Sequence, residues 1–118
     1  MQYMLLIARE DAITTDAAPE DREKISGAFM AYTRALKEAG VMLAGDALQP
    51  STTATTVRVR DGKTQVLDGP YAEAKEQLGG YYLIDVPDLD TALEWAARCP
   101  GAAFGSMEVR PVMAVPRV

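Results

Sequence analysis

The sequence contains no histidine and only one cysteine, Cys99, among its 118 residues. A single cysteine cannot form a disulfide within the chain, and the lack of histidine removes the commonest metal ligand and the commonest general base. Zinc sites of the Cys and His type, Ser-His-Asp triads, Cys-His pairs and His-ligated haem are therefore excluded. We expect neither a metal site nor an organic cofactor.

Basic residues and long apolar runs are also scarce. Twelve Lys and Arg stand against 17 Asp and Glu, so the formal net charge is −5, and no segment is rich in cations. This balance argues against nucleic-acid and membrane-surface partners. The apolar start, residues 1–9, is too short to span a bilayer and lacks the pattern of a signal peptide. We therefore expect a cytoplasmic protein.

The remaining composition is that of an ordinary globular domain, with 48% hydrophobic and 25% charged residues. A chain of this length predicts one domain over residues 1–118. Hydrophobic periodicity with caps and breakers predicts two helices, one from Pro19 to a stop at Gly40 and one from the N-cap Asp88 to a stop at Pro100-Gly101. It also predicts six strands, at residues 2–9, 41–48, 53–60, 63–67, 81–86 and 104–113.

Two of these strands have features that bear on the fold. Asp61-Gly62 lies between residues 53–60 and 63–67 and predicts a two-residue hairpin turn. Gly45 and Asp46 interrupt the strand at residues 41–48, which indicates either a bulge or a close approach of a ligand to the backbone.

The predicted order of elements is strand, helix, strand, hairpin, strand, helix, strand. This order is the split βαβ plan of ferredoxin-like α+β folds with a β-hairpin inserted, in which an antiparallel sheet carries two helices on one face. The strands at residues 2–9 and 81–86 are apolar on both faces, so the face without helices needs a cover. We expect a second copy there, packed sheet on sheet as a homodimer.

One segment carries a resemblance to a known family. It reads Asp68-Gly69-Pro70-Tyr71-Ala72-Glu73-Ala74-Lys75-Glu76, and the matching parts elsewhere are residues 3–7, 44–50, 52–60, 77–84 and 108–111. Together they resemble the signature of DGPF proteins, a branch of the YCII-related family. The resemblance implies a dimeric α/β barrel, a wider superfamily that includes muconolactone isomerases, and genes often placed beside extracytoplasmic-function sigma factors. The His-Asp pair proposed as an active site in YCII-like relatives cannot exist here, because the chain has no histidine.

The same segment supplies the candidate catalytic residues. Asp68 follows the predicted hairpin in a rigid Asp-Gly-Pro turn, and Glu76 shares one face with Glu73 if residues 72–77 form a helical turn. Crowded carboxylates have pKa values that move apart, so Asp68 and Glu76 are the acid-base candidates. The alternative is that Asp68 caps a turn, both glutamates face water, and Lys75 forms a weak surface ion pair.

Ligand-binding candidates complete the predicted site: Glu73, Lys75, Tyr81, Arg110 and Gly45. Lys75 and Arg110 are suited to orient an anion, and Tyr81 can donate a hydrogen bond. The alternatives are a surface salt bridge from Arg110 to Glu108 or Asp85, and core packing for the adjacent Tyr81 and Tyr82, which point to opposite faces.

Two functions follow from these residues. The first is a homodimer that binds a small organic acid or lactone-like molecule, with acid-base chemistry of an isomerase or lyase type. The second is a non-catalytic regulatory or interaction module that acts with a sigma factor. The absence of histidine favours binding over turnover.

Overall fold

The computed structural model describes residues 1–71 and 74–115, and its centre is an antiparallel four-stranded sheet. The strand order is β2-β5-β1-β6, formed by Met42–Ala47, Gln77–Asp85, Gln2–Arg9 and Ser106–Pro111. The two long central strands, β5 and β1, are the ones that the sequence marks as apolar on both faces. The predicted α+β architecture is confirmed, and this topology is consistent with a ferredoxin-like fold.

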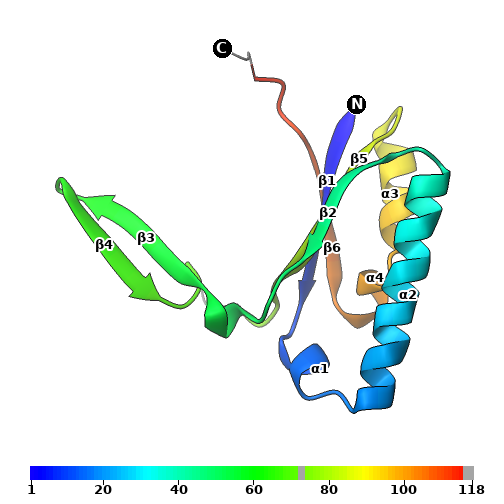
Figure 1. Ribbon diagram of the computed structural model, residues 1–118. Helices are drawn as coiled ribbons and strands as arrows, with labels where there is room; N and C mark the ends of the chain where they lie inside the picture. Colours follow the sequence, from blue (N-terminus) through cyan, green and yellow to red (C-terminus); the bar gives the residue numbers. More distant parts are fainter. Residues whose placement is uncertain (72–73, 116–118) are drawn as a thin grey trace.

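Two long helices lie on one side of this sheet (Figure 1). Helix α2, Pro19–Glu38, begins at a proline with acids in its first turn, and Gly40 follows its end with a φ of 71°. Helix α3, Leu89–Arg98, has Asp88 as N-cap, whose carboxylate accepts a hydrogen bond from the backbone N–H of Thr91 at 2.8 Å. The capping signals therefore predicted both starting points correctly.

Several element boundaries differ from the prediction. The strand expected from residue 53 begins two residues later, because Ser51–Thr53 form a 3-10 turn (η1) before β3. Strand β5 begins at Gln77 rather than at residue 81, since the Gly79-Gly80 pair is part of the strand. Short helices α1, Ala12–Thr15, and α4, Gly101–Phe104, were not predicted. Pro100-Gly101 ends one helix and begins another, so it is not a simple stop.

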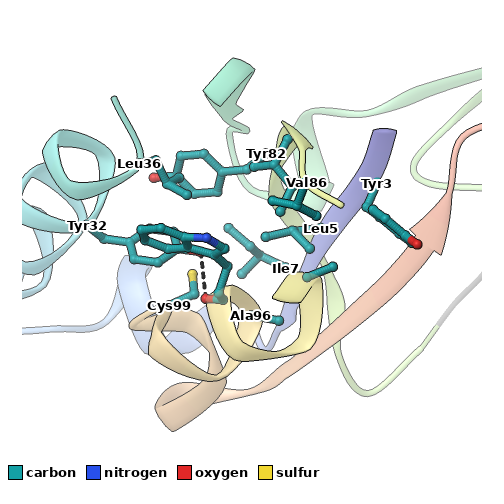
Figure 2. Packing of buried hydrophobic residues seen from close by; sticks show 12 residues of the cluster. Tyr3, Leu5, Ile7, Tyr32, Leu36, Tyr82, Val86, Ala96 and Cys99 are labelled. Atoms are coloured by element: carbon teal, nitrogen blue, oxygen red, sulfur yellow. Dashed lines mark hydrogen bonds between the residues drawn. The ribbon is translucent and has the colours of Figure 1, made fainter. Parts of the chain in front are cut away.

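The hydrophobic core lies between the two helices and one face of the sheet. Leu5 and Ile84 of the sheet and Leu36 of α2 are fully buried, and Figure 2 shows the surrounding side chains gathered between α2 and the strands. The hydroxyl of Tyr32 donates to the backbone carbonyl of Trp95 at 2.7 Å, which satisfies an acceptor in the last turn of α3. Core packing thus joins both helices to the sheet.

Helix α3 buries one of its faces in the core. Ala92, Trp95 and Ala96 face the core, whereas Leu89 and Leu93 are 47% and 46% exposed. Trp95 has the largest apolar side chain in the helix, and aromatic side chains dominate core energetics, so the face that carries Trp95 is the one that packs against the core. Cys99 is buried, and burial raises the pKa of its thiol, so this cysteine is unreactive packing as expected.

The opposite face of the sheet is without a helix in the described residues. Strand alternation and register place Met4 and Leu6 of β1 beside Leu83 and Tyr81 of β5 on this face. Because these side chains are only half-buried, the single chain leaves an apolar surface there, which we call the open face. Among the described residues, no helix is long and apolar enough to cross a membrane.

The predicted hairpin is confirmed, and it stands away from the rest of the chain. Strands β3, Thr55–Arg60, and β4, Lys63–Asp68, pair only with each other. Asp61 and Gly62 form the turn with φ values of 53° and 72°, as a two-residue hairpin turn requires. We call residues 55–68 the arm. In Figure 1 the arm projects on the side of the sheet opposite to α2 and α3.

Candidate functional site: a cationic cleft under helix α2

A hollow of functional interest lies between α2 and the sheet. Tyr32 and Leu36, in the second half of α2, are buried, but Phe29 is only half-buried and Met30 is 62% exposed. A cavity of about 520 Å³ lies between the strands and the stretch of α2 from Ser26 to Lys37. Its apolar walls are Ile7, Phe29, Met30 and Met42. A volume of roughly 300 to 1,000 Å³ is typical of small-molecule sites.

Three cations line this cleft. Arg9 comes from the end of β1, and Arg34 and Lys37 come from α2, while Asp46 is the only carboxylate among the described lining residues. In residues 1–71 and 74–115, none of these cations takes part in an ion pair. The cleft is thus locally positive in a chain whose formal charge is −5, and a concave site lined by cations attracts anions.

Gly79 sets the position of Arg9. A Cβ added at Gly79 would lie 2.6 Å from Nε of Arg9, so only glycine leaves room for the guanidinium to cross the strand at this point. The Arg9 side chain also donates from a terminal nitrogen to the Gly79 carbonyl at 3.4 Å. The strand glycine therefore directs this cation along the cleft.

A pair of hydroxyls lies at the inner end of the cleft. Thr33 Oγ1 and the Tyr82 hydroxyl are 2.8 Å apart, and either can donate to the other. Burial raises the pKa of Tyr82, so its phenol keeps its proton at neutral pH and acts as a hydrogen-bond donor. Gly45 makes room for this ring, because a Cβ at Gly45 would lie 2.7 Å from Cδ1 of Tyr82.

Comparison with known proteins agrees with the family resemblance found in the sequence. The family model of the YCII-related domain matches residues 1–116. The chain belongs to the YCII-related family. An uncharacterized protein of Rhizobium meliloti (strain 1021) is 40% identical over 114 residues, which cover 95% of this chain and 92% of the relative. Assignment to the DGPF branch stays a prediction.

In this YCII-related chain, one predicted ligand-binding residue lines the cleft. Gly45 lies on β2 opposite Tyr82, and the group that approaches its backbone is the Tyr82 ring; the approach of a ligand stays a prediction. The bulge itself lies earlier in β2, between Met42 and Ala44. Leu43 is the residue without a partner there, so the sequence predicted the irregularity but placed it too late.

Tyr81 and Arg110 lie on the open face, away from the cleft. The Tyr81 hydroxyl donates to Oδ2 of Asp46 at 2.7 Å, and this hydrogen bond to a carboxylate raises the pKa of the phenol. Nε of Arg110 is 3.7 Å from Oε2 of Glu108, with both side chains exposed. Arg110 therefore makes the surface salt bridge that the sequence analysis gave as its alternative. Tyr81 and Tyr82 do point to opposite faces, as predicted.

The residues of the family signature are spread along the chain's path from the arm to the sheet. Asp68 ends β4 and is exposed, and the root of the arm is closed by a hydrogen bond from the Gly69 N–H to the Ala54 carbonyl at 2.7 Å. Lys75 and Glu76 line a second hollow with Phe104 of α4. Glu73 lies outside the described residues, and residues 74–77 form no helical turn.

Glu76 has a specific partner in this family member. Its Oε1 accepts a hydrogen bond from Ser106 Oγ at 2.9 Å, which connects the segment before β5 to the start of β6. This contact gives Glu76 a structural role, and its acid-base role stays a prediction.

The sequence analysis missed Arg9, Arg34, Lys37 and Thr33 as site residues. A signal for them exists on α2, where Met30, Arg34 and Lys37 recur at intervals of four and three and so form a stripe beside the apolar one. A second signal is Gly79 inside a strand, which marks a close approach of another group to the backbone.

Proposed function

We propose that this YCII-related chain binds a small organic acid in the cleft under α2. The apolar body of the ligand contacts Phe29, Met30 and Met42, and its carboxylate lies near Arg9 and Lys37. The observation that carries this proposal is a set of three cations without ion-pair partners in the described residues, all lining an apolar cleft of about 520 Å³. An anion in this position gains charge-assisted hydrogen bonds, which are about twice as strong as neutral ones.

The hydroxyl pair supports the ligand class. While Tyr82 and Thr33 stay hydrogen-bonded to each other, one proton of the pair remains to donate to a carboxylate or carbonyl oxygen that enters the cleft. Such groups orient a ligand and select oxygen-bearing molecules over hydrocarbons. A lactone or keto acid fits this donor set as well as a simple carboxylic acid does.

The test compares a carboxylate with its neutral amide. We expect 2-naphthoate to bind in titration calorimetry at least 10-fold more tightly than 2-naphthamide, and Arg9→Gln to remove most of that preference. Arg110→Gln is the matched control, because it removes an arginine from the same sheet on the opposite face. Equal binding of acid and amide, or a loss with Arg110→Gln but not with Arg9→Gln, contradicts the cleft assignment.

Acid-base chemistry is a separate proposal, because its candidate residues, Asp68 and Glu76, do not line the cleft. The sequence assigns it to Asp68 and Glu76, and both Asp68→Asn and Glu76→Ala are expected to leave naphthoate binding unchanged while abolishing any turnover of a lactone substrate. Wild-type turnover in both variants contradicts the assignment.

The proposed assembly is a homodimer in which two open faces pack together to form a dimeric α/β barrel. Support comes from the apolar side chains of β1 and β5 that one chain leaves half-buried, Met4, Leu6, Tyr81 and Leu83. Sedimentation equilibrium at micromolar concentration tests it, and a stable monomer contradicts it. Action with a sigma factor stays a prediction, tested by a pull-down with purified factor.

A further inference from the structure

The arm exposes apolar side chains that its own chain does not cover. Every residue from 57 to 68 is exposed, including Val57, Val59 and Val66 at 60%, 59% and 63%. Val57 of β3 pairs with Val66 of β4. Val59 lies two residues after Val57 on β3, so all three valines are on one face of the arm. A two-stranded hairpin alone is marginally stable in water, and such a face needs a surface to pack against.

The other face of the arm is basic. Arg58, Arg60 and Lys63 alternate with the valines, and Arg58 Nε donates to Oε1 of Gln65 across the strands at 3.0 Å. With Asp61 and Asp68, the arm has a net charge of +1, which leaves −6 for the remainder of a chain whose formal charge is −5. The arm is therefore electrostatically complementary to the body of another copy of the same chain.

The direction of the arm fits the same partner. Figure 1 shows the arm on the side of the sheet opposite to α2 and α3, which is the side of the open face. The radius of gyration is 16.2 Å, against about 13.5 Å for a compact domain of this length. A second copy that packs on the open face therefore meets an arm that extends beyond its own domain.

We propose that the arm clasps a second copy of this chain, with the valine face against the partner's body. In a two-fold dimer each chain gives one arm and receives one, so the contact is made twice. This inference rests on the homodimer of the proposed function and names the element that fastens it. The organic-acid cleft is independent of it, because the cleft lies on the helix side of the sheet.

Substitution of the valine face tests the clasp. In sedimentation equilibrium we expect Val57→Asp with Val66→Asp to raise the dimer Kd at least 10-fold, which corresponds to about 1.4 kcal/mol. Leu89→Asp is the matched control: Leu89 is 47% exposed at the start of α3, where an acid is tolerated, and its dimer Kd should equal that of the wild type. Substitution of Arg58 and Arg60 by Glu should raise the dimer Kd more at low salt than at high salt.

A photo-crosslinking residue at Val66 in the otherwise unchanged chain gives a second measurement. We expect crosslinks between chains that map to the partner's body, and this result stands even if the double Asp variant fails to fold. A wild-type monomer overturns the homodimer and the clasp together. A wild-type dimer whose Kd is unchanged by the valine substitutions, or whose crosslinks stay within one chain, overturns the clasp alone.

Discussion

Gly79→Ala separates the role of the strand glycine in stability from its role in the cleft. An alanine Cβ at this position would lie 2.6, 2.9 and 3.2 Å from Nε, Cζ and Cδ of Arg9. These atoms belong to a long flexible side chain whose hydrogen bond to the Gly79 carbonyl is long, at 3.4 Å. Arg9 can therefore swing away, and the backbone of β5 does not have to move.

The magnitudes follow from this difference. In a strand interior, alanine gains roughly 0.5 to 1 kcal/mol over glycine from the lower entropy of the unfolded chain, which offsets the displacement of Arg9. We expect the free energy of unfolding in urea to change by less than about 1 kcal/mol. Hydrogen bonds to charged groups contribute about 1.5 to 3 kcal/mol, which corresponds to a change in affinity of about 10- to 150-fold. Because the cleft is open to water, we expect the lower part of this range, a weakening of naphthoate binding by roughly 10- to 30-fold.

A double-mutant cycle shows whether the effect passes through Arg9. If Gly79→Ala acts by displacing the guanidinium, it should cause no further loss in the Arg9→Gln background. Calorimetry with 2-naphthoate on the wild type, both single variants and the double variant gives the coupling directly. Wild-type affinity of Gly79→Ala, or additive losses in the double variant, refutes the assignment of Arg9 to the ligand.

Three further substitutions test the packing around the site, each in urea unfolding. Gly27→Ala should stabilise the chain by roughly 0.5 to 1 kcal/mol, because a Cβ there meets nothing within 4 Å and alanine favours the helix. Gly45→Ala should destabilise it by about 1 to 3 kcal/mol, since its Cβ would lie 2.7 Å from the buried ring of Tyr82. Tyr32→Phe should cost about 1 to 3 kcal/mol by leaving the Trp95 carbonyl without its donor. Burial raises the pKa of Tyr32 above its ordinary value of 10.0, so the unfolded chain loses the phenol proton at a lower pH than the folded chain does. The free energy of unfolding of the wild type should therefore fall as the pH rises above 10. The fall should be less steep in Tyr32→Phe, which has no phenol proton at this position.

Local patterns were enough to predict the six strands and the two long helices but not their spacing. Ile25, Phe29, Tyr32 and Leu36 recur at intervals of four, three and four and so share one face of α2, yet Leu36 is fully buried and Phe29 is not. Periodicity gives the direction of a side chain and says nothing of how far the helix stands from the strands. The cleft exists because of that distance, so the sequence could not reveal it.

The signature segment shows that residues close in the sequence need not form one site. Asp68 and Glu76 are eight positions apart, and a continuous motif suggested one site. The strand that carries Asp68 belongs to the arm, whereas Glu76 immediately precedes β5 and bonds to Ser106 of β6. Because the arm projects from the sheet, Asp68 lies away from the body of the chain. The alternation of apolar and polar residues predicted the two strands of the arm but could not show that β3 and β4 pair only with each other.

Neighbouring residues of strand β2 face opposite sides of the sheet, so this strand contributes both to the cleft and to the open face. Gly45 lies under the Tyr82 ring in the cleft, and the next residue, Asp46, accepts the Tyr81 hydroxyl on the open face. A shift of register by one residue would exchange these positions and place a carboxylate against the buried ring. The bulge at Leu43 adds one residue between Met42, which pairs with Ile84, and Ala44, which pairs with Leu83. Because Ile84 and Leu83 are consecutive, deletion of Leu43 leaves both pairs in place and should spare naphthoate binding and dimer formation, whereas Arg9→Gln should impair binding alone.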